Sequence, residues 1–470
     1  RLSGPSRTTS PPLQGPGFPC GSALVPGKGV QSTPGNLKPS EEQMINLTPW
    51  LNAPAWYIAF SGGLDSTVLL HLLGDYVRHH ASPPLRAIHV HHGLQSAADA
   101  WPAHCQAICD NLGIELRVIH VQIAPGASLE QAARDARYAA FEQALSPGDI
   151  LFTGQHRDDQ AETLLFRLLR GAGLRGLAAM PVQRALGQGS LVRPLLACSR
   201  QQLQAYARMK GLAWIEDPSN ADTHFARNFL RGEVLPHLQQ RWPQTTQNLA
   251  RAAEHLGEAL GLLDELAQGD LACAERGAPK AWAGLDSLDL ASLVALSPAR
   301  QRNALQYWLS LRTRLPDTRH WAGWADLRDA AGDAQPVWRL ADGQLLRSHG
   351  RIWWLSGDWL QLPVGELAWV NPTGPLVLPG NGSVRLAVAQ PFADLRIAYR
   401  KGGEMLDVPG RGRRDLKRLL NELQVPHFLR PRLPLLYQGE CLLAVANLPG
   451  LVQADCQLHW QLPTNAQGLS

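Results

Sequence analysis

Residues 61–66 read Ser-Gly-Gly-Leu-Asp-Ser and carry the clearest chemical signal in the chain. They stand between two apolar runs, in the order expected of a strand, a glycine-rich loop and a helix. Gly62 and Gly63 let the backbone turn tightly and approach a ligand, and the N-terminus of a helix favours an anion. With the hydroxyls of Ser61 and Ser66 added, this loop is predicted to hold phosphate.

Asp65 distinguishes this loop from a Walker-type phosphate loop, in which a lysine stands before the hydroxyl residue. A carboxylate beside phosphate has a use if it holds a metal ion such as Mg²⁺, or if it caps the helix. The alternative is a plain strand-to-helix turn with a Ser/Asp cap. The complete Ser-Gly-Gly-x-Asp-Ser pattern favours the functional interpretation.

Two further segments follow predicted strands. His91 and His92 end the strand predicted over 85–91, where a side chain points toward the ligand crevice of a parallel sheet. After the strand predicted over 149–153, three acids and a histidine gather at the start of a helix: Asp158, Asp159, Glu162 and His156. Asp159 and Glu162 share a helix face, so they suit Mg²⁺ or a substrate ammonium group, although acids also favour any helix N-terminus.

Arginines recur at helical spacing. Arg134 and Arg137 share a face of the helix predicted over 128–145, and Arg227 and Arg231 share a face of a helix that follows a turn at 217–220. Paired arginines suit phosphate, carboxylate or nucleic acid, and a solvated helix face is the alternative.

The densest basic stretch lies near the C-terminus, between residues 409 and 418. Glycine flexibility combined with clustered charge suits an RNA backbone, and a solvated basic loop is the alternative. The residues predicted to bind RNA here are Arg411, Arg413, Arg414, Lys417 and Arg418.

Strand-like and helix-like segments alternate from residue 55 to about 235, which predicts an α/β fold with a doubly wound, mostly parallel sheet. Ligands in such folds bind at the carboxyl ends of the strands. The predicted strands are 56–60, 85–91, 115–121 and 149–153, and the predicted helices are about 65–80, 96–112, 128–145 and 158–170.

Composition changes divide the chain further. We expect a disordered extension over 1–43, a nucleotide-binding catalytic domain over 44–242, a helical middle domain over 243–360, a linker or β-hairpins over 361–390, and a small basic α/β domain over 391–470. Met44 is the first methionine and is the expected start of the native chain. A long amphipathic helix is predicted over 246–274. Six tryptophans between 308 and 354 are predicted to be core, with an RNA-stacking platform as the alternative.

Bulk properties restrict the class of protein. The 470 residues carry a net charge of +4, which fits an RNA partner without demanding one. Seven cysteines without a Cys-x-x-Cys pair favour a reducing compartment and disfavour a disulfide framework or zinc knuckle. No apolar run reaches the length of a membrane span and no signal peptide is present, so we expect a cytoplasmic protein without membrane contact.

The Ser-Gly-Gly-x-Asp-Ser loop resembles the signature of the PP-loop, or N-type, ATP pyrophosphatases. Several longer segments are more specific, and with them the chain resembles the tRNA(Ile)-lysidine synthetase family. These segments are 91–94, 128–141, 153–180, 214–231 and 400–437. Gln95 stands where that family commonly has arginine.

The resemblance implies the substrates and the reaction. The partners would be ATP with Mg²⁺, L-lysine and the isoleucine tRNA with a CAU anticodon, and a homodimer is left open. ATP would adenylate the 2-oxygen of the wobble cytosine and release pyrophosphate. The lysine amine would then attack C2, AMP would leave, and lysidine would result.

The resemblance also implies roles for residues. Ser61, Gly62, Gly63, Leu64 and Ser66 would bind the nucleotide, Asp65 would hold Mg²⁺ or a phosphate-bound water, and His91 and His92 would lie near the nucleotide. Asp159 and Glu162 would recognise lysine or metal. Arg134, Arg137 and Arg227 would contact ATP, the lysine carboxylate or tRNA.

Three other functions compete. A PP-loop cytidine thiolase would resemble enzymes that use a Cys-x-x-Cys pair, which this chain lacks. A GMP or NAD synthetase would lack the basic C-terminal domain. A non-catalytic, ATP-gated RNA-binding protein would have no need of Asp65 and the acids near 158–162.

Overall fold

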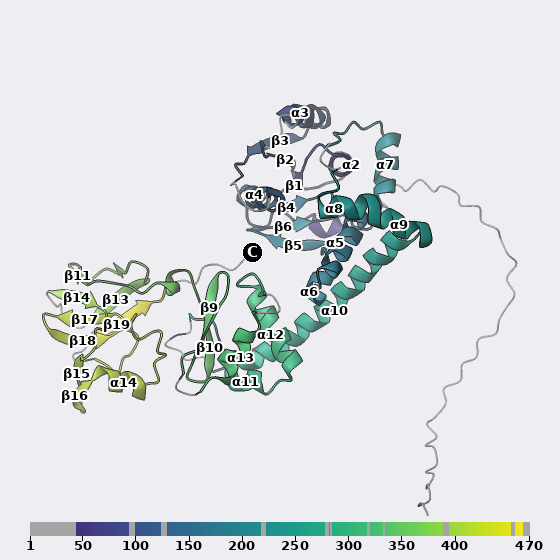
Figure 1. Cartoon of the computed structure of the whole chain (residues 1–470). Coiled ribbons are helices and arrows are strands. Elements are labelled where there is room, and N and C mark those ends of the chain that lie inside the picture. The colour runs from purple at the N-terminus through teal and green to yellow at the C-terminus, as the bar shows by residue number, and fades with distance from the viewer. Residues whose placement is uncertain are drawn as a thin grey trace, which may run out of the picture.

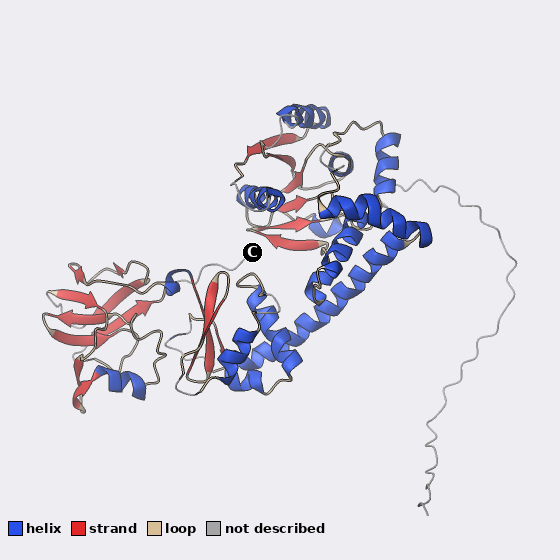
Figure 2. Ribbon diagram, in the orientation of Figure 1, coloured by secondary structure: helices blue, strands red, loops and turns tan. Residues whose placement is uncertain are grey.

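The computed structural model describes residues 44–93, 99–123, 129–217, 222–277, 282, 284–316, 320–331, 334–388, 394–452 and 456–463. Within these residues an N-terminal α/β part, a middle part and a β-rich C-terminal part follow one another (Figures 1 and 2). The segment predicted to be disordered, 1–43, lies outside the described residues, as do Gln95, Ser128 and the turn residues 218–220.

The N-terminal part is built on a six-stranded sheet of order β3-β2-β1-β4-β6-β5. Its first four strands in chain order are parallel, as predicted, and β6 continues them, whereas β5 runs antiparallel to β6. The sequence did not predict β5 and β6, which have four residues each. The bounds are β1 Trp56–Ala59, β2 Leu85–His91, β3 Glu115–His120, β4 Ile150–Phe152, β5 Gln183–Leu186 and β6 Gly189–Val192.

Helices cover both faces of this sheet, which confirms the doubly wound arrangement (Figure 1). Successive side chains of a strand point to opposite faces. Trp56 and Ile58 accordingly pack into one core with α2 (Leu64–His79), α3 (Trp101–Leu112) and α7 (Arg200–Met209). Tyr57 and Ala59 pack into the other core with α4 (Leu129–Ala144).

A helical stretch from 226 to 241 packs against α5 (Arg157–Leu169). It consists of α8 (Ala226–Phe229), the π-helical turn η4 (Leu230–Val234) and α9 (Leu235–Arg241). Pro236 lies just after the π turn. Because proline has no N–H to donate to the carbonyl of Gly232, and its ring crowds that carbonyl, a wider turn replaces the α-helical one here.

The long helix α10 (Thr245–Ala274) joins the N-terminal and middle parts, in agreement with the helix predicted over 246–274 (Figure 1). Its first half packs on α5 and on α6 (Leu174–Leu177), where Leu164, Ala179 and Ala253 are buried together. An ion pair between Arg175 and Asp264 adds to this contact. Its second half packs on α11 (Leu290–Val294) and α12 (Pro298–Ser310).

The middle part also contains a four-stranded sheet of order β7-β10-β9-β8, which the prediction of a helical domain missed. All six residues of β10 are buried, so the strand shows no polar alternation in sequence. Trp354 packs against the helices of the middle part and Trp353 against the C-terminal part. The bounds are β7 Ser287–Asp289, β8 Val337–Arg339, β9 Gly343–Ser348, β10 Arg351–Ser356 and α13 Ala322–Asp329.

The tryptophans between 308 and 354 form core, as predicted. Trp321 is partly buried, and the other five are at most 6% exposed: Trp308, Trp324, Trp338, Trp353 and Trp354. Rings buried to this extent have no face free for an RNA base, which speaks against the stacking platform.

The C-terminal part is rich in strands and has one short helix in the residues described, rather than an even α/β mixture. Strand β11 (Leu367–Trp369) pairs with β14 (Leu395–Ala398), while β13 (Ser383–Val388) pairs with both β12 (Leu376–Val377) and β19 (Cys456–Gln461). Of the two alternatives predicted for segment 361–390, a linker or β-hairpins, the structure shows strands that belong to the C-terminal sheets. The other elements are β15 Met405–Val408, β16 Gly412–Asp415, α14 Leu416–Glu422, β17 Leu435–Gln438 and β18 Cys441–Val445.

Two short 3₁₀-helices complete the described elements: Thr48–Trp50 and Gly357–Leu360. Among the described residues, no helix combines the length and the apolar character that a membrane crossing requires.

Candidate active site

The loop between β1 and α2 is shaped by its glycines and serines. Gly62 has φ +81°, and a Cβ there would lie 2.9 Å from Cδ1 of Ile215, so no larger residue fits without movement. Gly63 precedes the first residue of α2. The hydroxyls of Ser61 and Ser66 lie 3.0 Å apart, and Oγ of Ser66 also donates to the carbonyl of Gly63 at 3.0 Å. This places both hydroxyls at the N-terminus of α2, where an anion is favoured.

The loop after β4 lies directly against the first turn of α2. A Cβ added to Gly154 would approach the carbonyl carbon of Asp65 to 3.0 Å, so glycine is what allows the two loops to touch. The contact brings the start of α5 beside Asp65. Residues about 95 positions apart in sequence thereby share one edge of the sheet, at the carboxyl ends of β1 and β4, where ligands of such folds bind.

His156 lies at the centre of this edge and is fully buried. Its Nε2 is 3.5 Å from Oδ2 of both Asp65 and Asp159, and its Nδ1 is 3.7 Å from Oδ2 of Asp158. Burial lowers the pKa of His156, but the carboxylates of Asp65, Asp159 and Asp158 outweigh burial and raise the pKa above its ordinary value. The histidine therefore favours its charged form among these acids. It was noted in the sequence but not predicted as a site residue.

Asp65 has one carboxylate oxygen without a hydrogen-bond partner among the described residues, the buried Oδ1. Burial raises the pKa of Asp65, and His156, Arg200 and Arg231 together lower it below its ordinary value. An ionised carboxylate with one unpaired oxygen beside a phosphate loop fits Mg²⁺, which binds through one or two carboxylates together with phosphate oxygens. No set of three or more His, Cys, Asp or Glu in the described ranges is arranged to hold a metal alone.

Arg231 ties the two predicted acids together. Its Nε donates to Oε1 of Glu162 at 2.7 Å, and its Nη2 donates to Oε2 of Glu162 and to Oδ1 of Asp159, both at 2.9 Å. Burial raises the pKa of Glu162 above its ordinary value even though Arg231 opposes this shift. The π turn η4 carries Arg231 to this position. The sequence placed Arg231 on the same helix face as Arg227, yet only Arg227 was predicted as a site residue.

Arg227, on α8, faces Arg167 of α5: burial lowers the pKa of Arg167, and the charge of Arg227 lowers it further. The side chain of Arg167 donates to the carbonyls of Gly176 and Ala179, both at 2.8 Å. The two arginines predicted to share a face thus meet opposite charges on α5: acids for Arg231 and a cation for Arg227.

The histidines at the end of β2 lie one strand away from the phosphate loop. Nε2 of His91 is 3.5 Å from Oδ1 of Asp99, and its ring lies edge-on to that of His120. Burial and the charge of Arg137 lower the pKa of His92 to about 4, so this imidazole is neutral at pH 7. Nδ1 of His92 is buried and has no hydrogen-bond partner among the residues described. The neighbouring His89, which no motif indicated, is buried with its Nδ1 2.9 Å from the carbonyl of Phe60.

The predicted RNA-binding residues lie at the opposite end of the molecule from the phosphate loop (Figure 1). They occupy the β15–β16 hairpin and the start of α14. Arg411 and Arg418 pair with Glu422, at 2.7 and 3.3 Å, while Arg413, Arg414 and Lys417 are exposed. The structure therefore separates these residues from the loop at 61–66.

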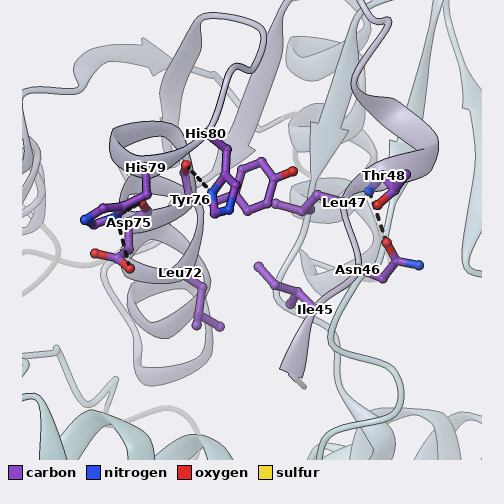
Figure 3. Close-up of a pocket in the computed structure, with 9 residues that line it drawn as sticks. All are labelled: Ile45, Asn46, Leu47, Thr48, Leu72, Asp75, Tyr76, His79 and His80. Carbon is purple, nitrogen blue, oxygen red and sulfur yellow. Dashed lines mark hydrogen bonds and ion pairs between the residues drawn. The ribbon is translucent and has the colours of Figure 1, made fainter. Parts of the chain in front are cut away.

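A hollow of about 550 Å³ lies elsewhere, between residues 45–48 and the C-terminal end of α2 (Figure 3). In it the rings of Tyr76 and His80 stack with centroids 4.2 Å apart. A 16-residue helix is about 24 Å long, so this hollow is separate from the phosphate loop at the other end of α2. Its lining residues are Ile45, Asn46, Leu47, Thr48, Leu72, Asp75, Tyr76, His79 and His80.

Comparison with known proteins shows the family to which this chain belongs. Residues 37–238 match the model of the PP-loop domain. The chain is 85% identical to tRNA(Ile)-lysidine synthase of Pseudomonas putida, over 91% of this chain and 100% of that protein. The chain belongs to the tRNA(Ile)-lysidine synthase family. It is also 62% identical to the tRNA(Ile)-lysidine synthase of Pseudomonas fluorescens, over 90% of this chain and 97% of that protein.

The two remaining parts of the chain match the same family. Residues 288–353 match the TilS substrate binding domain, and residues 395–463 match the TilS substrate C-terminal domain. Among solved structures, the U34-tRNA thiolase NcsA from Methanococcus maripaludis is similar at 18% identity with a TM-score of 0.40, over 46% of this chain and 77% of that one. Membership of the tRNA(Ile)-lysidine synthase family supports lysidine formation with ATP.

Proposed function

We propose that this protein ligates L-lysine to C2 of the wobble cytidine in the isoleucine tRNA with a CAU anticodon. ATP would first adenylate the cytosine 2-oxygen and release pyrophosphate, and the lysine amine would then displace AMP. The observation that carries the proposal is the meeting of the phosphate loop with Asp65, Asp159 and Glu162 at one edge of the sheet. This edge offers an anion site and a cation site within reach of each other.

The phosphate loop serves the adenylation step. The backbone N–H groups of residues 61–66, with the hydroxyls of Ser61 and Ser66, would stabilise negative charge that builds on the α-phosphate. Asp65 would hold Mg²⁺ through its open Oδ1, and Mg²⁺ when bound supplies further charge neutralisation. His91 and His92, at the end of the neighbouring strand, would contact the nucleotide.

Asp159 and Glu162 would bind the ammonium group of the lysine substrate. In this structure the two acids bind the guanidinium of Arg231, a cation, so their position and charge also suit the lysine ammonium. A lysine held here would share the acids with Arg231 or displace it. Arg134, Arg137 and Arg227 would contact the lysine carboxylate, ATP or tRNA.

The remaining parts of the chain serve the tRNA. The target cytosine lies in an anticodon loop, where a base leaves its stack at low cost. Arg411, Arg413, Arg414, Lys417 and Arg418, at the far end of the molecule, would bind the RNA backbone. Contacts at two distant points would orient the tRNA, and holding ATP and the base together lowers the barrier by proximity.

The test measures incorporation of radiolabelled lysine by the purified protein with Mg·ATP and an unmodified isoleucine tRNA transcript with a CAU anticodon. The initiator and elongator methionine tRNAs, which share that anticodon, are the controls. We expect label in the isoleucine tRNA alone, with one pyrophosphate released for each lysine incorporated. Pyrophosphate release without lysine incorporation would refute the assigned substrate. Absence of ATP turnover in the presence of tRNA would favour a binding protein.

A further inference from the structure

A tyrosine on α4 is surrounded by three arginines from three different elements. The Cζ atoms of Arg134 on α4 and Arg184 on β5 lie 4.9 and 5.0 Å from the ring centroid of Tyr138, and Nη2 of Arg134 is 3.3 Å from the phenol oxygen. Arg193, which follows β6, faces the same phenol. The cluster is therefore assembled by the tertiary fold, and we refer to these four residues as the Tyr138 cluster.

None of the three arginines forms an ion pair with a described acid, and two of them are held by backbone carbonyls instead. Nη1 of Arg193 donates to the carbonyl of Pro181 at 2.7 Å, and Nη1 of Arg184 donates to that of Ala185 at 2.9 Å. Arg193 is 4% exposed, and its Nε has no hydrogen-bond partner among the described residues. Carbonyls can hold a buried guanidinium, but here Nε of Arg193 is left unpaired and two further arginines lie close by, with no compensating anion among the described residues.

The charges of the cluster are not compensated within the part of the protein that the structure describes. Burial lowers the pKa of Arg193, and Arg184 and Arg134 lower it further against the opposing effect of Tyr138. Burial raises the pKa of Tyr138, but Arg134, Arg193 and Arg184 outweigh burial and lower it below its ordinary value. The shift of Arg193 reports mainly its burial, whereas the lowered pKa of Tyr138 reports the positive charge of the three arginines, which a bound anion would relieve.

The cluster lies beside the site already described. Arg193 follows Val192, the last residue of β6, and β6 is parallel to β4, so Arg193 stands at the same carboxyl edge as the phosphate loop. Two strand spacings, about 10 Å, separate β6 from β1 in the sheet. Arg184 and Arg193 come from the β5 and β6 side of β4, whereas α4, which carries Arg134 and Tyr138, also contacts β2.

We propose that Tyr138, Arg134, Arg184 and Arg193 bind a phosphodiester group of the RNA strand that carries the target cytidine. A guanidinium group can donate two parallel hydrogen bonds to the oxygens of one phosphate. Phosphate contacts set the position of a nucleic acid on a protein. The loop at 61–66 already provides for the phosphates of ATP, so a second anion site across β4 fits the other polyanionic substrate. The proposal rests on the proposed function insofar as it assumes an RNA substrate.

The test compares tRNA binding by the full-length protein and by Arg184→Gln, without ATP or lysine, over a range of salt concentrations. We expect the variant to bind the isoleucine tRNA about 3- to 10-fold more weakly. The negative slope of log affinity against log salt should become shallower by about 0.7 to 0.9, the value for one lost phosphate contact. Arg184→Lys keeps the charge and should restore most of that slope. ATP affinity measured without RNA should not change.

Arg208→Gln is the matched control, because this exposed arginine lies on α7, on the opposite face of the sheet from α4. It should leave RNA affinity and salt slope unchanged. Unchanged RNA binding by Arg184→Gln would overturn the proposal, and so would a loss confined to ATP affinity, which would assign the cluster to the nucleotide. A failure of the wild-type protein to incorporate lysine would refute the proposed function instead, since the cluster is judged by RNA affinity alone.

Discussion

Two clusters in this protein are built around arginine, one buried and one partly exposed, and they differ in how completely their polar atoms are paired. At the joint between the middle and C-terminal parts, Arg432 is 1% exposed and donates to the carbonyls of Asp358, Gln361 and Gly380 and to Oδ1 of Asn381. At the carboxyl edge of the N-terminal sheet, Arg231 binds acids, yet polar atoms next to it remain without partners.

The joint continues this pattern of complete pairing. Nδ2 of Asn381 donates to the carbonyl of Arg432 at 2.9 Å, and Nε1 of Trp460 donates to the carbonyl of Asn381 at 2.8 Å. Trp353 of the middle sheet and Phe428 of the C-terminal part lie with ring centroids 5.6 Å apart in one shared core. Such a joint holds two parts of the chain in a fixed arrangement.

The sheet edge shows the opposite pattern. Neither ring nitrogen of His156 and not Oδ1 of Asp65 has a hydrogen-bond partner within the described ranges, although all three atoms are buried. His156 is nevertheless surrounded by three carboxylates, so the atom that marks a place for a ligand is Oδ1 of Asp65, since buried polar groups are normally paired. The two arginines therefore differ in their partners: Arg432 is held by backbone carbonyls and an amide oxygen, whereas Arg231 binds ionisable acids beside the phosphate loop.

The largest effect is expected for Asp65→Asn. The amide keeps the size of the side chain but removes the charge that would hold Mg²⁺, so lysine incorporation should fall by about 10³-fold or more. The melting temperature should change by only a few degrees. Single-turnover incorporation and thermal unfolding measure the two quantities. Asp75→Asn, at the other end of α2, should alter neither, and near-normal activity of Asp65→Asn would refute the assignment of the sheet edge.

The joint should respond in the opposite way. Arg432→Met removes the donor for several buried oxygens, each costing about 1–3 kcal/mol when left unsatisfied, so unfolding free energy should fall by about 3–5 kcal/mol. Lysine incorporation per folded molecule should change less than threefold. Urea denaturation compares this variant with Arg385→Met, which replaces an exposed arginine of β13. A loss of activity without loss of stability would contradict the distinction between the two clusters.

Arg231→Gln tests whether Arg231 controls the charge of the acids at the sheet edge. Burial already raises the pKa of Glu162, and removal of the guanidinium should raise that pKa further. The ionised form exists only above the pKa, so the acid limb of the profile of kcat/KM for lysine against pH should move to higher pH. At neutral pH we expect about 10- to 100-fold lower kcat/KM, partly recovered as pH rises. An equal loss at every pH would show that Arg231 does not act through the acids.

The smallest effect concerns His92. Its pKa of about 4 in the folded protein is below the ordinary value near 6.5, so the unfolded chain binds a proton that the folded protein does not. Stability is fully present above about pH 6.5 and falls as pH drops toward 4, by about 1–2 kcal/mol after allowance for solvent screening. His92→Gln should flatten this part of the curve of unfolding free energy against pH. An unchanged slope between pH 6.5 and 4 would contradict the shift.

The local pattern of the sequence was sufficient for the first four strands and the helices that follow them. The opposite orientations of Trp56 and Tyr57 in the strand, and the turn at Gly62 and Gly63, are determined by residues that are close together in sequence. The sequence does not predict the middle sheet because β10 is buried on both faces, and whether its short apolar run 352–355 becomes strand or helix depends on what covers it. For segment 361–390 the sequence allows both a linker and β-hairpins, because the strands that pair with it lie far along the chain.

For the site, the sequence by itself determined which residues could do chemistry. The phosphate loop and the acids Asp65, Asp159 and Glu162 follow from residue type and spacing near strand ends. Tertiary structure decided how these groups are charged and what they contact. Arg231 reaches Glu162 across 69 positions, and the Tyr138 cluster draws on three elements. Electrostatic interaction depends on distance in space, and only packing of the sheet and its helices determines that distance.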